Sequence, residues 1–174
     1  HYQLAIAGRH NVKNSLAAAA AALSAGVSAQ AVIAGLKAFS PVKGRSRALT
    51  LAVRGRSVTL VDDTYNANPD SVRAAIDVLA DLPGPHLLVL GDMGEVGHQG
   101  PMFHAEAGHY AQAKGIEHLC TLGELAAVAA TAYGGAQHQA SMEDLIRTVQ
   151  DILPQVRSVL VKGSRFMRME RVVD

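Results

Sequence analysis

Apolar positions recur with helical spacing in the first forty residues of the chain. Alanine has the lowest cost in a helix, so the run Ala17–Ala22 predicts a helix, and Gly26 is placed to end it. Ser28 is placed to cap a second helix that reaches about Phe39. This second helix is predicted to bury one apolar face, formed by Val32, Ile33 and Leu36. A short strand, Tyr2–Ala7, is predicted before both helices.

Beyond residue 45 the pattern changes to short strands that alternate with helices. Leu49–Val53 and Val58–Val61 alternate in polarity around Gly55 and predict a β-hairpin. Later strands are predicted at residues 86–90, 117–122, 136–140 and 158–161. Helices are predicted at residues 72–82, 102–114, 124–132 and 142–153, and a last one near Phe166. Such alternation with short connections indicates an α/β fold with a mostly parallel sheet and helices on both faces.

The segment Ser40–Arg45 breaks the helical pattern and predicts a boundary between two units, residues 1–40 and 41–174. One strand and two helices are too few to form a core. We therefore expect the first unit to be the end of a domain whose beginning is missing. A chain that starts at His1 and not at Met fits the same expectation.

Composition narrows the class of protein. The 174 residues are 49% hydrophobic, which is enough for a core, and their net charge is +1. With balanced charge and few aromatic residues, nucleic acid is not an expected partner. The single Cys120 indicates a reducing compartment and a buried, inert thiol. The alanine-rich run Leu16–Ala25 is too short and too weakly apolar to span a bilayer, so membrane insertion is not expected.

The stretch Asp62–Ser71 carries more hydrogen-bonding groups than a short turn needs. It joins a predicted strand to a predicted helix, and ligands of open α/β sheets bind beyond the carboxyl ends of strands. Asp62 and Asp63 are predicted to point to opposite sides, one toward the sheet and one toward a cleft. The alternative is that Asn66, Asn68 and Asp70 only satisfy the turn and cap the next helix. That alternative does not explain Tyr65 or both acids.

Two further groups suit an anionic or nucleotide ligand. Asn11 and Asn14 are three residues apart and share a helix face, and each carboxamide offers the donor and acceptor that an adenine edge requires. A helix cap with a spare asparagine is the alternative. Arg45 could bind a phosphate with two hydrogen bonds, although an exposed linker arginine is favoured by composition alone.

The segment Lys162-Gly163-Ser164-Arg165 follows the last predicted strand and could bind a carboxylate or phosphate; a basic surface turn is the alternative. The chain contains no G-x-x-x-x-G-K-[ST] phosphate loop. The glycines of Gly91–Gly97 have the spacing G-x-x-G-x-x-G, which argues against a dinucleotide-dependent oxidoreductase. A metal site at Asp92, Glu95 and His98 is disfavoured because no repeated His or Cys spacing accompanies it.

Five segments stand in order along the chain: Gly8-x-His10-Asn11-Val12-x-Asn14, Gly44-Arg45, Asp62–Ser71, Leu90–Glu95 and Val161–Arg165. Read together, they closely resemble the Mur ligase family, the muramoyl-peptide ligases of bacterial cell-wall synthesis. The resemblance implies a three-domain enzyme with a UDP-sugar domain, a central ATPase and a C-terminal Rossmann-like domain. Residues 1–40 would be the tail of the central domain, and residues 41–174 would be most of the C-terminal one.

The Tyr-Asn-Ala-Asn-Pro and Gly-Asp-Met-Gly-Glu loops resemble the branch that joins D-Ala-D-Ala to UDP-N-acetylmuramoyl-tripeptide through an acyl phosphate, using ATP and Mg²⁺. A monomer in the bacterial cytoplasm is implied. In the family, the catalytic lysine and the magnesium ligands belong to the central domain. No catalytic or metal residue is therefore assigned here, and this chain alone is expected to be inactive.

The resemblance also implies two sets of binding residues. The set for ATP is Asn11, Asn14, Arg45, Asp63 and Tyr65. The set for the dipeptide is Asn66, Asn68, Lys162, Ser164 and Arg165. In the first set, Asn14 would contact the adenine, Arg45 the phosphates and Asp63 the ribose. Two other functions stay open: a non-catalytic nucleotide- or peptide-binding module, and a Mur ligase that adds another amino acid.

Overall fold

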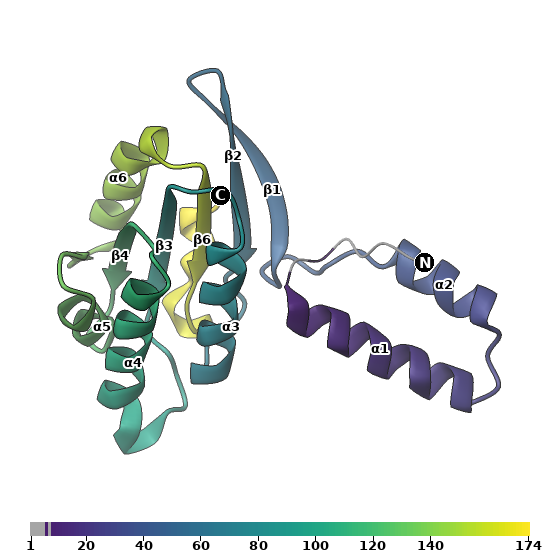
Figure 1. The fold of residues 1–174 in the computed structure, drawn as a ribbon. Helices are drawn as coiled ribbons and strands as arrows, with labels where there is room; N and C mark the ends of the chain where they lie inside the picture. The colour runs from purple at the N-terminus through teal and green to yellow at the C-terminus, as the bar shows by residue number, and fades with distance from the viewer. Residues whose placement is uncertain (1–5, 7) are drawn as a thin grey trace.

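The computed structural model describes residue 6 and residues 8–174. The predicted strand Tyr2–Ala7 lies, apart from Ile6, outside these residues. A helical hairpin, α1 (Arg9–Ser24) and α2 (Ala29–Ala38), stands beside an α/β domain (Figure 1). Both helices were predicted, and the Ser28 hydroxyl caps α2 by accepting a hydrogen bond from the Ala31 amide.

A six-stranded sheet forms the centre of the α/β domain, with strand order β1-β2-β6-β3-β4-β5. The strands are β1 (Arg47–Val53), β2 (Arg56–Asp63), β3 (His86–Gly91), β4 (His118–Leu122), β5 (Gln137–Gln139) and β6 (Ser158–Lys162). β1 and β2 form the predicted antiparallel hairpin, and every other neighbouring pair is parallel. The prediction of a mostly parallel sheet is confirmed.

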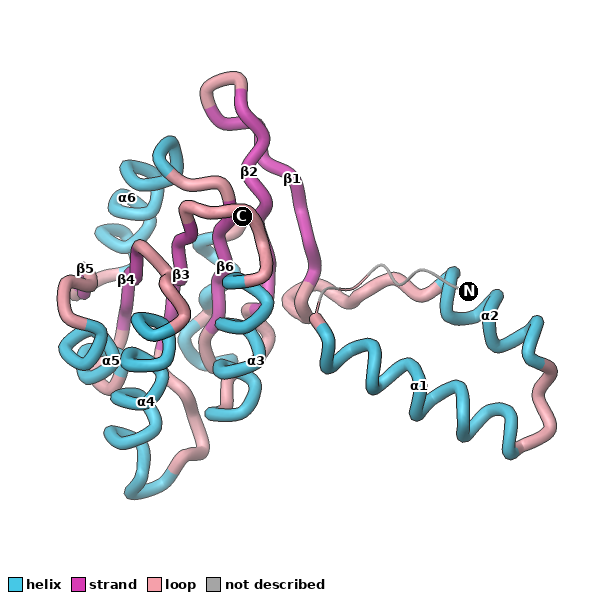
Figure 2. The backbone as a smooth tube through the Cα atoms, viewed as in Figure 1, coloured by secondary structure: helices cyan, strands magenta, loops and turns pink. Residues whose placement is uncertain are grey.

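Helices cover both faces of this sheet (Figures 1 and 2). They are α3 (Pro69–Ala80), α4 (Gly100–Ala113), α5 (Ala126–Tyr133) and α6 (Met142–Ile152). Alternate residues of β3 point to opposite sides, as strand geometry requires. Leu88 and Leu90 pack in one cluster with α3, α4 and α5, whereas Leu87 and Val89 pack in a second cluster with α6. The predicted two-sided architecture is therefore confirmed. Because β2 and β6 are parallel neighbours, their carboxyl ends lie side by side.

Two predictions about helices are wrong. The expected face of α2 is only half-buried, and none of its residues is buried, because the hairpin stands away from the sheet that would have covered it. The predicted last helix is instead a pair of 3₁₀ turns, Arg165–Met167 and Met169–Val172. Arg168 lies between them at φ 50°, a left-handed conformation that interrupts helical hydrogen bonding. The buried Met169 side chain packs in the same cluster as α6.

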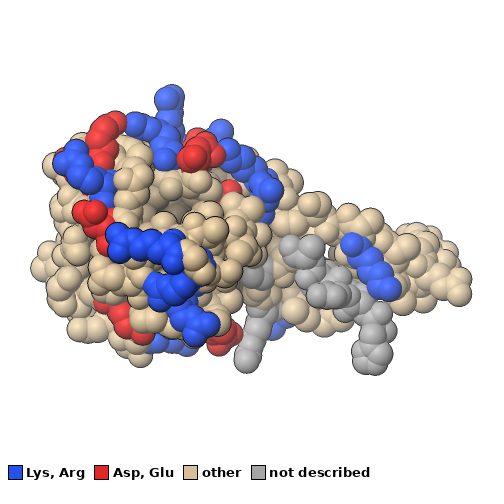
Figure 3. Space-filling view, turned by 90° about the horizontal axis from the view of Figure 1, so that it is seen from above, with Lys and Arg blue, Asp and Glu red and all other residues tan. Residues whose placement is uncertain are grey.

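Charged side chains of both signs are interspersed over the visible face of the α/β domain, whereas the helical hairpin of α1 and α2 shows few of them (Figure 3). Within the part of the chain that the structure describes, no helix has the length and apolar character needed to cross a bilayer. Cys120 is fully buried, and this burial raises the pKa of its thiol to about 12. The predicted burial of the thiol is thus confirmed, and its lack of reactivity stays a prediction.

Candidate functional site

A cleft of about 580 Å³ lies between the start of α1 and the carboxyl ends of β2 and β6. Residues from four separate parts of the chain line it: Ile6, His10, Asn11, Asn14, Gly44, Arg45, Ser46, Asp63, Tyr65, Asn66, Asn68, Asp70, Ser71, Ala74, Ala75 and Lys162. All five residues predicted to bind ATP are among them, together with three of those predicted for the dipeptide. The cleft is where an open α/β sheet is expected to bind a ligand.

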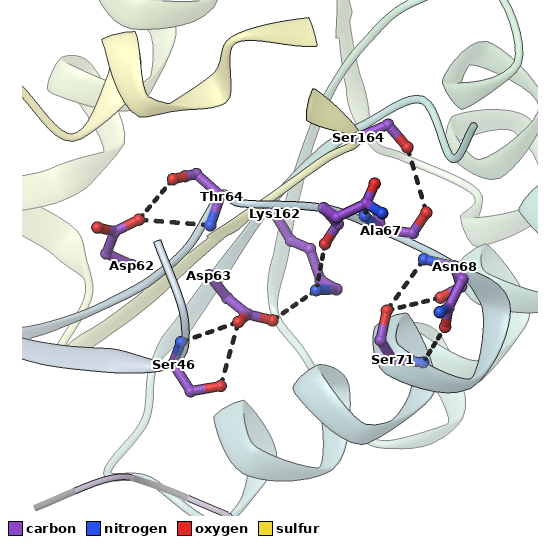
Figure 4. A network of polar contacts seen from close by, with 10 residues as sticks. Ser46, Asp62, Asp63, Thr64, Ala67, Asn68, Ser71, Lys162 and Ser164 are labelled. Atoms are coloured by element: carbon purple, nitrogen blue, oxygen red, sulfur yellow. Dashed lines mark hydrogen bonds and ion pairs between the residues drawn. The ribbon is translucent and has the colours of Figure 1, made fainter. Parts of the chain in front are cut away.

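The two adjacent aspartates at the end of β2 point to opposite sides, as predicted (Figure 4). Asp62 is 1% exposed, and its carboxylate accepts hydrogen bonds from the Gly44 amide at 2.9 Å and the Thr64 hydroxyl at 2.7 Å. Asp63 instead faces the cleft, where Oδ1 accepts from the Ser46 amide at 2.9 Å and Oδ2 lies 2.5 Å from Lys162 Nζ. Asp62 therefore holds the loops together, and Asp63 is the carboxylate that a ligand can reach.

Arg45 is held at the cleft by the pairing of two loops. The Tyr65 amide donates to the Gly44 carbonyl at 2.9 Å, and Gly44 has φ 80°, a left-handed conformation that glycine adopts without strain. A side chain at position 44 would also approach the Tyr65 amide nitrogen to 3.0 Å. The Arg45 guanidinium stacks 3.9 Å from the centre of the Tyr65 ring. This cation–π contact orients an arginine that composition alone had described as an exposed linker residue.

The loop between β2 and α3 ends in a helix cap. Asn68 Oδ1 accepts from the Ser71 amide at 2.8 Å, the Ser71 hydroxyl accepts from the Asn68 amide at 3.0 Å, and Pro69 is the first residue of α3. Asn66 Oδ1 accepts from the next amide, that of Ala67, at 2.9 Å. The turn-and-cap alternative thus accounts for the amide oxygens of both asparagines. It does not account for Asp63 or Tyr65, both of which line the cleft.

Asn11 and Asn14 lie on one face of α1, as their spacing predicted, and both line the cleft. Asn14 Nδ2 approaches Asn11 Oδ1 at 3.4 Å, so the two carboxamides are neighbours. They belong to α1, whereas Arg45 and Asp63 come from the loop before β1 and the end of β2. One ligand with a planar polar end and an anionic end could contact both walls.

Lys162, Ser164 and Arg165 differ sharply in exposure, although the sequence grouped them as one anion site. Lys162 and Ser164 are each 2% exposed, whereas the Arg165 side chain is 69% exposed. The Ser164 hydroxyl donates to the Ala67 carbonyl at 3.2 Å and accepts from the Gly94 amide. Arg165 lies 5.7 Å from the Tyr65 ring and 3.8 Å from a Glu170 oxygen. Of the three, Arg165 is the one whose charge faces solvent.

Sequence reasoning assigned no role to two residues that hold loops in place, Ser46 at the cleft and His104 at the loop after β3. Ser46 has φ 50° and donates both its amide and its hydroxyl to Asp63 Oδ1. His104 of α4 is 0% exposed; its Nε2 accepts from the Met93 amide at 2.9 Å, and its Nδ1 lies 2.7 Å from the Gly100 carbonyl. No spacing signal in the sequence marked either contact, since both depend on how distant segments meet.

In the glycine-rich loop after β3, Asp92 has a structural role. Asp92 Oδ1 accepts from the Ala126 amide at 2.7 Å and so fixes the start of α5. Across residue 6 and residues 8–174, no group of three or more His, Cys, Asp or Glu side chains is arranged to hold a metal ion.

A family model described as Mur ligase, glutamate ligase domain, matches residues 44–165. The chain belongs to the Mur ligase family. It is 41% identical over 172 residues to the UDP-N-acetylmuramoyl-tripeptide–D-alanyl-D-alanine ligase of Escherichia coli K12, covering 98% of this chain and 37% of that relative. The enzyme of the same name from Haemophilus influenzae is 40% identical over 171 residues, covering 95% and 37%.

Solved structures of Mur ligases have a similar fold over almost the whole of this chain. MurF from Acinetobacter baumannii superposes with a TM-score of 0.88 at 32% identity, covering 99% of this chain and 38% of that one. MurF from Thermotoga maritima in complex with ADP superposes with a TM-score of 0.80 at 25% identity, covering 97% and 38%. The Rossmann-like fold predicted from the family resemblance is confirmed. The chain spans 37% of the length of these two curated relatives.

The matched Mur ligase segment begins at Gly44 and ends at Arg165, and these limits bear on the cleft. The segment contains the wall formed by Arg45, Asp63 and Tyr65. It does not contain α1, which carries Asn11 and Asn14 on the other wall. The cleft thus lies where the Mur ligase segment meets the preceding helical hairpin.

Proposed function

We propose that this chain is the C-terminal part of an ATP-dependent ligase that joins D-Ala-D-Ala to UDP-N-acetylmuramoyl-tripeptide in bacterial peptidoglycan precursor synthesis. The observation that carries the proposal is the cleft of about 580 Å³, which gathers the five residues predicted to bind ATP. The E. coli relative is named for this reaction, and the T. maritima structure contains ADP, which supports a nucleotide as the ligand.

The two walls of the cleft suit the two ends of a nucleotide. Asn11 and Asn14 offer amide donors and acceptors to an adenine edge. Arg45, stacked on Tyr65, offers a planar guanidinium to phosphate oxygens. Asp63 Oδ2, which accepts only from Lys162, can accept one further hydrogen bond, which suits a ribose hydroxyl.

The proposed reaction has two steps. The tripeptide carboxylate attacks the γ-phosphorus of ATP and displaces ADP, giving an acyl phosphate. The amine of D-Ala-D-Ala then attacks the acyl carbon, forms the peptide bond, loses a proton and releases inorganic phosphate. Mg²⁺ would neutralise phosphate charge in the first step, and we assign it no residue of this chain.

The contribution of this chain to those steps is binding, orientation and exclusion of water. An acyl phosphate hydrolyses if water reaches it, so the cleft must close around it. Positive charge near the developing oxyanions stabilises them, and Arg45 and Arg165 both lie against Tyr65 at the rim. The exposed guanidinium of Arg165 suits the carboxylate of the dipeptide, and Asn66 and Asn68 line the wall beside it.

Several broader expectations belong to the same proposal. Residues 1–40 are the tail of a central ATP-binding domain, and residues 41–174 are the C-terminal domain of the ligase. The enzyme acts as a monomer in the bacterial cytoplasm, without nucleic acid or membrane insertion. The isolated 174-residue chain is inactive, because its sequence has no phosphate loop.

A phosphate-release assay on the full-length protein tests the proposal. We expect phosphate only when ATP, UDP-N-acetylmuramoyl-tripeptide and D-Ala-D-Ala are all present, and none from the 174-residue chain under the same conditions. Activity with glutamate or a diamino acid in place of the dipeptide would assign the protein to another branch of the family. Nucleotide binding by the full-length protein without any phosphate release would favour a binding module.

A further inference from the structure

Lys162 is a buried lysine at the carboxyl end of β6. Its side chain is 3% exposed, and its ammonium lies 2.5 Å from Asp63 Oδ2 and 2.9 Å from the Asn66 carbonyl oxygen. Removing an ammonium from water is costly unless it is paired and hydrogen-bonded. The Lys162 ammonium is therefore held by contacts inside the protein, in contrast to the solvent-facing Arg165.

The strand register explains why the two charges meet. In the parallel pair of β2 and β6, Asp63 stands opposite Lys162. Both residues are the last of their strands, so their side chains project together into the cleft edge. The contact joins residues that are 99 positions apart in the sequence. It is a consequence of the fold and not of a local turn.

The carboxylate of Asp63 is held from two sides. The Ser46 amide and hydroxyl donate to Oδ1 at 2.9 and 3.1 Å, and the Lys162 ammonium contacts Oδ2. These contacts set the rotation of the carboxylate about its Cβ–Cγ bond. Oδ1 thus accepts two hydrogen bonds within the protein, whereas Oδ2 accepts one from Lys162 and keeps the capacity for a further one from a ligand. A carboxylate fixed in this way is prepared to accept a hydrogen bond from a ribose hydroxyl at Oδ2.

Lys162 also fixes the loop that carries Tyr65. Its second contact is to the Asn66 carbonyl, and Ser164, two residues later, donates to the Ala67 carbonyl (Figure 4). A substrate carboxylate that bound Lys162 would have to compete with Asp63 for the ammonium. It would also have to reach a nitrogen that the protein has already enclosed.

We propose that Lys162 is a positioning residue for nucleotide binding: it orients Asp63 toward the ribose hydroxyls and does not bind the carboxylate of the dipeptide. This inference rests on the proposed function and changes the role that the family resemblance implied for Lys162. It leaves Arg165 as the cation for the dipeptide.

Steady-state kinetics of the full-length protein test the inference with a double-mutant cycle of Lys162→Met and Asp63→Asn. A hydrogen bond to a charged group that is lost or misdirected lowers affinity by about tenfold or more. We expect Lys162→Met to raise KM for ATP by about that factor and to leave KM for D-Ala-D-Ala unchanged. In the Asp63→Asn background the same lysine substitution should have little further effect, because the two residues act as one unit.

The preference for ATP over a deoxyribose analogue should change only if Lys162 acts on ribose binding, and not if its role is merely structural. The wild-type protein should prefer ATP to 2′-deoxy-ATP or 3′-deoxy-ATP, and Lys162→Met should reduce that preference toward parity. The matched control is Lys114→Met, which removes a lysine paired with Asp77 at 2.6 Å but outside the cleft. The control should leave both KM values and the ribose preference unchanged.

The outcomes separate this inference from the proposed function. No phosphate release from the wild-type protein with all three substrates would refute the proposed function itself. A normal wild type whose Lys162→Met variant shows a raised KM for the dipeptide and an unchanged KM for ATP would overturn the role of Lys162 alone. Additive effects of the two substitutions in the cycle would overturn it as well.

A spectroscopic measurement covers the case in which Lys162→Met does not fold. In the full-length protein labelled with ¹⁵N-lysine, the Lys162 ammonium should give a signal protected from exchange with water. Asp63→Asn should abolish or shift that signal and leave the Lys114 signal unchanged. A Lys162 signal that is insensitive to Asp63→Asn would contradict the pairing.

Discussion

Replacing Asp62 by alanine removes a buried carboxylate that holds two loops together. The Gly44 amide and the Thr64 hydroxyl, both buried, would lose their acceptor. A buried donor left without a partner costs about 1–3 kcal/mol, so two of them cost roughly 2–6 kcal/mol. This is a large part of a typical unfolding free energy of about 5–15 kcal/mol.

Urea denaturation of the 174-residue chain, followed by circular dichroism, measures this loss. With a slope of about 2 kcal/mol per molar urea, the midpoint for Asp62→Ala should fall by roughly 1–3 M. The matched control is Asp151→Ala, which makes the same change at an exposed position of α6 and should stay within about 0.5 kcal/mol of wild type. An Asp62→Ala midpoint equal to that of the control would refute the structural role assigned to Asp62.

Three other predictions concern stability and reactivity. Burial raises the pKa of the Glu117 carboxyl, but hydrogen bonds from the His86 amide and ring outweigh it and leave this pKa below the ordinary 4.5. This group therefore stabilises the fold above pH 4.5, and in urea titrations the wild type should lose more stability than Glu117→Gln as the pH falls below that value. Cys120, with its pKa near 12, should react with a thiol reagent only when urea unfolds the chain; rapid labelling of the native chain would contradict its burial. Gly108→Ala should destabilise the chain severely, because its Cβ would collide with the Ala129 carbonyl of α5. Gly35→Ala in helix α2, where a Cβ has open space, should be neutral or stabilise the chain by about 0.5–1 kcal/mol. Equal urea-denaturation midpoints for the two variants would be evidence against the close packing of α4 on α5.

Much of the fold could be predicted because it depends on local patterns. The alternation of apolar residues found β1 and β2, and the polar loop after β2 led to the correct opposite orientations of Asp62 and Asp63. The failures have physical causes. The half-buried face of α2 lacks a covering layer in the described structure, and the left-handed Arg168 ends a turn that propensity alone would extend.

The candidate site was harder to predict, because its contacts join distant segments. Sequence spacing grouped Lys162, Ser164 and Arg165 as one basic cluster. The sheet register instead brings Lys162 beside Asp63, and the loops bring Ser164 against Ala67. The exposure of each cation decides which of them can meet a ligand, and exposure depends on tertiary packing that a single sequence does not reveal.

Mass spectrometry of the reaction product tests the central claim most directly. The full-length protein would be incubated with ATP, UDP-N-acetylmuramoyl-tripeptide and an equimolar mixture of D-Ala-D-Ala, glutamate and diaminopimelate. The account predicts one new UDP-linked product, heavier than the substrate by D-Ala-D-Ala less one water, together with ADP and phosphate. A product that carries glutamate or diaminopimelate, or ADP formed with no new peptide bond, would contradict it.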